Sequence, residues 1–226
     1  MVSTFEKKPL RSGAYTLPDA ADLLGVPLAR LCAWVRGTAR EKKRHFPAGR
    51  FASRSEGRDR HVDFYTLIEL FTVAQLREKG LSMKTLRRCR KDLAERFDTP
   101  YPFALCGLLT DGRRLLKELG EEALLELGTG GQTAFEAVMG PFCERIDFDA
   151  TSNLAAKYFP LGRDVPVAVS PTHAFGRPVI DGTNLPTETI ASLIRGGESI
   201  DDVASAYELP PESVEQAWCF EQRRAA

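Results

Sequence analysis

The stretch YTLPDAADLLGVPLARLCAWVRG, residues 15–37, decides how the first half of the chain folds. Thr16 can cap a helix that begins at Leu17-Pro18, because its hydroxyl accepts hydrogen bonds from the free amides of a first turn and proline suits that turn. Gly25 can end this helix in the left-handed conformation, and residues 28–36 form a second helix. Two short helices joined by a tight glycine turn are typical of a helix-turn-helix.

Basic residues are concentrated in the half of the chain that contains this motif. Residues 1–97 hold 21 Lys/Arg and 11 Asp/Glu, a net charge of +10, whereas residues 98–226 hold 10 and 20, a net charge of −10. This asymmetry indicates that a part facing nucleic acid or a membrane is joined to a part with another task. No apolar run approaches the ~20 residues that cross a bilayer, so we expect no membrane partner.

A basic segment follows the second helix. Residues 40–61 read REKKRHFPAGRFASRSEGRDRH, and their proline and glycines prevent one continuous helix, so two strands around a basic loop, a wing, would fit. Its cations would neutralise DNA phosphates, while an arginine on the second helix could bond a guanine. Trp34 fits the core or phosphate packing better than base recognition. The residues predicted to contact DNA are Thr16, Arg30, Trp34, Arg36, Arg40, Lys42, Lys43, Arg44, Arg50, Arg54, Arg58 and Arg60.

Two longer helices complete this half. Asp63 caps a helix to about residue 79, and Ser82 caps another in which Leu86, Cys89 and Leu93 share a face. The outer face of the last helix carries the basic residues Arg87, Arg88, Arg90 and Lys91. The sequence DTPYP, residues 98–102, stops any extension of that helix.

The pattern changes after this break. Short apolar runs separated by turn signals predict a small antiparallel sheet, with one helix inserted at 132–144. The runs are 103–109, 123–127, 145–148, 155–159 and 165–169. Three helical patterns follow at 187–195, 199–207 and 211–224. We therefore predict an α+β protein with a flexible lead-in (1–14), a winged helix-turn-helix domain (15–97), a small antiparallel sheet region (103–170) and a trihelical module (175–226).

The stretch FGRPVIDGTNLP, residues 175–186, introduces the last module. Its glycines lack phosphate-loop spacing and no Lys-Ser/Thr follows, whereas Asp-Gly suits a hairpin or a tightly turned arm. Residues 175–226 hold 4 Lys/Arg and 9 Asp/Glu, a net charge of −5, which disfavours phosphate contact. The arm could touch a protein partner, pair with a second copy, or only brace the helices. Its candidate partner-binding residues are Val179, Ile180, Thr183, Asn184 and Leu185.

Two resemblances extend these predictions. Residues 15–37 and 62–89 resemble the MerR family of winged helix-turn-helix regulators, which implies that residues 28–36 enter the major groove and that the wing straddles the backbone. Residues 175–222 resemble the family called domain of unknown function 433, through Gly176–Ile180, Gly182-Thr183, Pro186, Ser199–Tyr207 and Pro211–Glu221. That family is similar to antitoxin modules encoded beside PIN-like ribonuclease toxins, so the resemblance implies antitoxin activity.

The sequence thus predicts a cytoplasmic, homodimeric DNA-binding antitoxin that neutralises a PIN-like toxin and represses its own operon. One alternative is a MerR-like regulator whose C-terminal half senses a ligand or dimerises. A second is a metal-dependent nuclease that uses Asp147 and Asp149, which alternate along a predicted strand. The chain lacks the usual hydrolase and nucleotide-binding motifs, and its five cysteines lack metal spacing, so we expect no enzyme, cofactor or metal.

Overall fold

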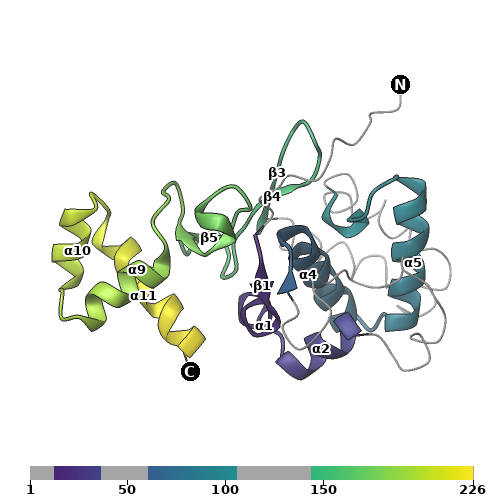
Figure 1. The fold of residues 1–226 in the computed structure, drawn as a ribbon, viewed down its shortest axis with the longest axis horizontal. Coiled ribbons are helices and arrows are strands. Elements are labelled where there is room, and N and C mark those ends of the chain that lie inside the picture. The colour runs from purple at the N-terminus through teal and green to yellow at the C-terminus, as the bar shows by residue number, and fades with distance from the viewer. Residues whose placement is uncertain (1–12, 37–60, 106–143, 226) are drawn as a thin grey trace.

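The computed structural model describes residues 13–36, 61–105 and 144–225. Within these ranges the protein is α+β, with helices and three two-stranded antiparallel sheets. Figure 1 shows an elongated arrangement. The helices of the first half lie at one end, the strands β3–β6 lie between, and the C-terminal helices form the other end. None of the described helices is long and apolar enough to cross a membrane.

The first two helices form as the sequence predicts. Helix α1 (Leu17–Leu24) is capped by Thr16, whose hydroxyl accepts from the Asp19 amide at 3.2 Å. It ends at Gly25, which has φ 63°, a left-handed value that a residue with a Cβ adopts at a cost. Helix α2 (Leu28–Arg36) follows directly. Strand β1 (Tyr15–Thr16) precedes α1 and pairs antiparallel with β2 (His61–Val62).

Two longer helices pack against this pair (Figure 1). Helix α4 (Phe64–Glu78) is capped by Asp63, and α5 (Met83–Arg96) is capped by Ser82, as predicted. Helix α5 stops where DTPYP begins, and the chain then makes the 3₁₀ helix η2 (Pro102–Ala104). The prediction that a strand starts at Phe103 is therefore wrong for residues 103 and 104. The Phe103 carbonyl accepts a hydrogen bond from the Thr72 hydroxyl at 3.0 Å and does not pair with a neighbouring strand.

One basic residue of α5 lies on the inner face. Arg90 is 4% exposed and makes a paired hydrogen bond with Glu69, which is fully buried on α4. Its guanidinium also donates to the Pro100 carbonyl at 2.7 Å. The prediction that Arg90 lies on the outer face is therefore wrong, because the buried carboxylate of Glu69 requires a cation beside it.

Four short strands lie between the two helical ends. Strand β3 (Ile146–Phe148) pairs with β4 (Ala155–Tyr158), and β5 (Val167–Ala168) pairs with β6 (Val179–Ile180). These agree with the runs predicted at 145–148, 155–159 and 165–169. Most of the predicted lead-in and wing, residues 1–12 and 40–60, lies outside the described residues. The same holds for residues 106–109 of the first predicted run, the run at 123–127 and nearly all of the helix predicted at 132–144.

Tyr158 joins the middle strands to the first helices in one hydrophobic core. Its side chain is fully buried, its hydroxyl donates to the Leu23 carbonyl at 3.1 Å, and its ring lies 4.9 Å from that of Phe71. Helices α1 and α4 and strand β4 therefore pack together in one core.

The C-terminal module has a smaller core of its own. Helices α9 (Thr187–Arg195), α10 (Ile200–Ala206) and α11 (Pro211–Ala225) correspond to the three predicted helices. They bury Ile190, Val203 and Val214 against Ile180 of β6. Strand β6 also pairs with β5, so backbone hydrogen bonds connect the module to the middle strands.

Candidate DNA and partner interfaces

Helix α2 presents one face to solvent and buries the other. Leu31, Trp34 and Val35 are at most 5% exposed, whereas Leu28 and Arg30 are exposed. Trp34 is therefore part of the core, because its indole fills the space between α2 and its neighbours. Arg87 of α5 donates to the Trp34 carbonyl at 3.3 Å and so fixes the last turn of α2.

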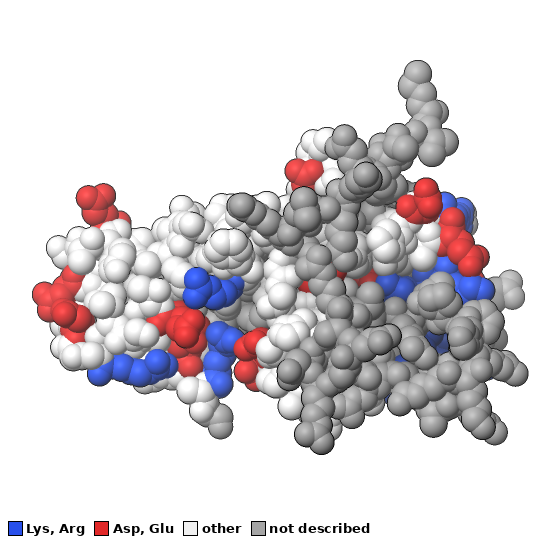
Figure 2. All heavy atoms as spheres, viewed as in Figure 1, with Lys and Arg blue, Asp and Glu red and all other residues white. Residues whose placement is uncertain are grey.

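The predicted DNA contacts are only partly described. Arg30 stands exposed on α2, while the Thr16 hydroxyl donates to the Asp19 carboxylate at 2.6 Å and serves as a helix cap. The structure does not describe the side chain of Arg36 or the eight predicted DNA contacts in the wing. Figure 2 shows basic side chains over α5, where Lys84, Arg88 and Arg96 are exposed.

The arm of residues 175–186 is largely built into the module. Val179 and Ile180 are 3% and 2% exposed, so their side chains cannot reach a partner, and the prediction that they bind one is not supported. The Thr183 hydroxyl donates to the Ile180 carbonyl at 2.8 Å and accepts from the Leu185 amide at 3.1 Å, which closes the predicted turn. Leu185 is half-buried against the module core. The arm therefore braces the helices.

Asn184 is exposed, but its side chain also has an internal role. Its side-chain oxygen accepts from the Ala174 amide at 2.9 Å. The chain at this point has positive φ at three successive residues: Ala174 (43°), Phe175 (58°) and Gly176 (87°). Such conformations cost about 1–3 kcal/mol each for residues other than glycine and persist where surrounding contacts fix them.

Gly176 is where the module touches the first strand. A Cβ at this position would lie 2.6 Å from the Tyr15 hydroxyl and 2.9 Å from the Gly13 Cα. Only glycine permits this close approach. Tyr15 is 4% exposed, and its hydroxyl has no hydrogen-bond partner among the residues that the structure describes. Burial, and then the nearby Asp63 carboxylate, raise the pKa of that hydroxyl.

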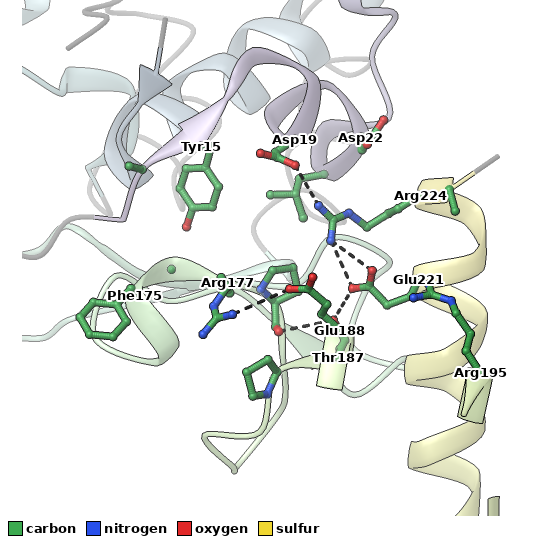
Figure 3. Close-up of a pocket in the computed structure, with 16 residues that line it drawn as sticks. Tyr15, Asp19, Asp22, Phe175, Arg177, Thr187, Glu188, Arg195, Glu221 and Arg224 are labelled. Atoms are coloured by element: carbon green, nitrogen blue, oxygen red, sulfur yellow. Dashed lines mark hydrogen bonds and ion pairs between the residues drawn. The ribbon is translucent and has the colours of Figure 1, made fainter. Parts of the chain in front are cut away.

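A group of polar side chains joins the last helix to the first (Figure 3). Arg224 of α11 donates to Asp19 of α1 at 3.2 Å and to Glu221 at 3.2 Å. Glu221 is 7% exposed and accepts from the buried Thr187 hydroxyl of α9. We call Asp19, Thr187, Glu221 and Arg224 the seam. Because one carboxylate comes from α1 and the other from α11, the guanidinium holds the two helices together.

A cleft of about 490 Å³ opens beside the seam. Tyr15 and α1 form one wall, and the arm with α9 and α11 forms the other (Figure 3). Arg177 and Glu188 form an exposed ion pair in it at 3.8 Å. The sequence did not predict this cleft, because Asp19 and Arg224 stand 205 positions apart and no local spacing relates them.

The two aspartates considered for metal catalysis have other roles in the structure. Asp147 forms an ion pair with Arg163. Asp149 accepts from the Ser152 amide at 2.7 Å and from the Thr151 amide at 3.1 Å, and the Ser152 bonds in particular lower the pKa of its carboxyl. Among the described residues, no three His, Cys, Asp or Glu side chains are grouped to hold a metal. These contacts make both aspartates structural residues of the β3–β4 region.

Comparison with known proteins shows that this chain is similar to one family model and to three relatives. The model of the family described as "Protein of unknown function (DUF433)" matches residues 167–220, which confirms the resemblance predicted for the C-terminal module. The chain is 26% identical over 225 residues to "Putative antitoxin VapB45" of Mycobacterium tuberculosis (strain ATCC 25618 / H37Rv), covering 90% of this chain and 91% of that one.

Two further relatives come from the same organism. The chain is 25% identical over 211 residues to "Uncharacterized protein Rv2308", covering 90% of this chain and 87% of that protein. The X-ray crystal structure of Rv2018 matches with a TM-score of 0.70 at 22% identity, covering 90% of this chain and 96% of that one. At this identity the crystal structure shows a shared fold. The likeness therefore extends over both halves of the molecule.

Proposed function

We propose that the protein is the antitoxin of a toxin–antitoxin pair, which binds its own operator DNA through the first half and a PIN-like ribonuclease toxin through the C-terminal module. The observation that carries this proposal is the likeness to "Putative antitoxin VapB45", because it covers 90% of this chain. The match of residues 167–220 to DUF433 supports the same conclusion for the module.

The first half has features that suit DNA. Helices α1 and α2 are consecutive short helices separated by Gly25, Val26 and Pro27, as the proposed helix-turn-helix requires, and Arg30 of α2 is exposed. The exposed cations of α5 and the net charge of +10 over residues 1–97 would attract phosphates. On this proposal α2 is the recognition helix of a MerR-like winged helix-turn-helix, and the basic segment of residues 40–61 is its wing.

The C-terminal module suits a protein partner. Its exposed residues include Asp201 and Asp202 of α10, and Figure 2 shows acidic side chains gathered at that end of the molecule. A net charge of −5 over residues 175–226 repels nucleic acid and attracts a basic protein. We propose that a homodimer places two such modules on one palindromic operator.

Two measurements test this function. A gel shift with the DNA upstream of the gene should show a complex that weakens as salt rises, because phosphate contacts release counterions. Co-expression with the product of a neighbouring PIN-like gene should restore growth and yield a stable complex. A chain that neither binds this DNA nor forms this complex would refute the proposal.

The cleft beside the seam favours a second candidate, a regulator that responds to a small ligand. Its volume of about 490 Å³ falls within the range of ligand pockets, and it lies between α1 and the module. A ligand there would contact both halves and alter DNA binding. This candidate requires a change of operator affinity with added ligand in the absence of any toxin.

A further inference from the structure

Phe175 is the most exposed large apolar side chain among the described residues. It is 72% exposed, compared with 43% for Leu28 and 42% for Tyr207. It lies in the segment 174–176, which we call the Phe175 loop, and has φ 58°. A bulky residue in the left-handed region whose ring is largely exposed contributes little to the hydrophobic core. Strain of this kind, together with an exposed aromatic ring, points to a binding role.

The Phe175 loop is held in place by its neighbours. The Ala174 amide donates to the Asn184 side chain at 2.9 Å, the Gly176 amide donates to the His173 carbonyl at 2.8 Å, and the Arg177 amide donates to the Ala174 carbonyl at 3.1 Å. Gly176 also lies against Tyr15. The backbone that carries the ring is therefore fixed before any partner arrives, which lowers the entropy lost on binding.

The surroundings of the ring resemble the centre of a protein–protein interface. Phe175 and Arg177 both line the cleft, and Figure 3 shows Phe175 at its edge with Arg177 between it and Glu188. The Arg177 and Glu188 side chains are 58% and 68% exposed, so a partner can reach both charges. An aromatic anchor beside a concave surface with a charged rim is the usual form of a binding hot spot.

Charge identifies the kind of partner. Residues 175–226 carry a net charge of −5, so the module attracts a cationic protein. A ribonuclease must bind the polyanionic backbone of RNA and therefore carries a basic surface. The same negative charge disfavours nucleic acid as the occupant.

We propose that the Phe175 loop, with the adjoining cleft, is the surface through which this chain binds its basic ribonuclease toxin. This inference rests on the antitoxin function proposed above. The predicted contact residues Val179 and Ile180 are buried, and the proposed contact is instead Phe175, an exposed aromatic residue of the same arm. The arm then positions the contact residue, and the module core supports the arm.

The test compares three variants of the full chain against the purified product of the neighbouring PIN-like gene. Phe175→Asn removes the ring and suits the backbone, because asparagine tolerates the left-handed region. Phe175→Tyr keeps an aromatic ring. Tyr207→Asn is the matched control, since Tyr207 is an exposed aromatic residue of the same module that does not line the cleft.

We expect Phe175→Asn to weaken toxin binding at least about tenfold, with Phe175→Tyr and Tyr207→Asn within about twofold of the wild type, in line with aromatic hot spots. Operator binding and thermal stability should remain unchanged in all three.

If the wild type binds the toxin and Phe175→Asn binds equally well, the inference fails while the proposed function stands. If the wild type does not bind the toxin, the proposed function itself fails. A loss of self-association in Phe175→Asn without loss of toxin binding would assign the surface to a second copy and overturn the inference.

Discussion

Arg224 and Asp19 stand 205 positions apart in the chain, and the Arg224 guanidinium donates to the Asp19 carboxylate at 3.2 Å. Asp19 lies in the first turn of α1, where its amide donates to the capping hydroxyl of Thr16. Arg224 lies in the last turn of α11. The contact therefore joins the first helix of the proposed DNA-binding motif to the last helix of the proposed toxin-binding module. Any movement of the module away from α1 must break it.

The first prediction concerns this contact. The side chains of Arg224 and Asp19 are 21% and 43% exposed, so solvent screens their attraction. A double-mutant cycle with Arg224→Gln and Asp19→Asn should give a coupling of about 0.5–1 kcal/mol in the free energy of unfolding. Arg224→Gln alone should cost more than Asp19→Asn, about 1–3 kcal/mol, because it leaves the buried Glu221 carboxylate without its cation.

Urea unfolding measures this coupling, and Arg223→Gln is its control. Arg223 is the exposed neighbour of Arg224 on α11, and its replacement should change the free energy of unfolding by less than about 0.5 kcal/mol. A coupling of zero would show that the two helices are not held together by this pair in solution.

The second prediction compares two glycines with similar backbone conformations. Gly176 and Gly182 have φ of 87° and 78°, but a Cβ at Gly182 would meet nothing within 4 Å, whereas at Gly176 it would lie 2.6 Å from the Tyr15 hydroxyl. Gly182→Ala should therefore cost about 1–2 kcal/mol from backbone strain alone. Gly176→Ala should cost a further 1–3 kcal/mol or so from overpacking against β1.

Thermal unfolding of both variants measures the difference, since each carries the same change in chemistry. Equal shifts in the melting temperature would mean that the module does not rest on Tyr15 in solution. A larger shift for Gly176→Ala would support the arrangement of α1, the arm and α11 in Figure 3.

Local sequence rules predicted most helices and failed where distant residues meet. Thr16, Asp63 and Ser82 cap their helices as expected, because capping depends on residues three positions away. The same rules placed Arg90 on the outer face, since its buried partner Glu69 lies on another helix 21 positions away.

In the candidate sites, too, local features could be predicted from the sequence and contacts between distant residues could not. Arg30 could be predicted as exposed because it is charged, but the burial of Val179 and Ile180 depends on their pairing with β5. No spacing in the sequence brings Asp19 to Arg224 or Tyr15 to Gly176, because these contacts arise only when the module packs on α1. The exposed ring of Phe175 was likewise inaccessible to pattern analysis, which treats an aromatic residue as core.

The third prediction is a pH dependence of stability caused by Glu69. Burial raises the pKa of its carboxyl from 4.5 to about 7, although the Arg90 guanidinium opposes this shift. Between these two values the folded state keeps a proton that the unfolded state has released. The free energy of unfolding should therefore fall as pH rises through this window, by about 3 kcal/mol in all. The stabilisation is complete below the unfolded pKa and lost above the folded one.

The control for this prediction removes both charges. Glu69→Gln with Arg90→Met leaves no titrating group at the site, so its urea midpoint should lack the part of the pH dependence that Glu69 supplies. Arg90→Met alone removes the cation that opposes the raised pKa of Glu69, so Glu69 should hold its proton to a higher pH than in the wild type. The destabilisation should therefore be largest at alkaline pH, about 3–5 kcal/mol, where the buried carboxylate is left without a cation. An identical pH profile in the wild type and the double variant would rule out the raised pKa.

The last prediction concerns the DNA-binding face. Arg30 is exposed on α2, whereas Leu31 and Trp34 of the same helix are buried. If α2 enters the major groove, Arg30→Ala removes a contact worth about 1–3 kcal/mol, which is about five- to 150-fold in operator affinity. Lys79→Ala removes an exposed cation of the same half from beyond the end of α4 and should change affinity less than about twofold. Titration of labelled operator and of an unrelated duplex with both variants separates the two roles. Equal losses on both duplexes would make Arg30 a phosphate contact, and no loss on either would place the DNA on another face.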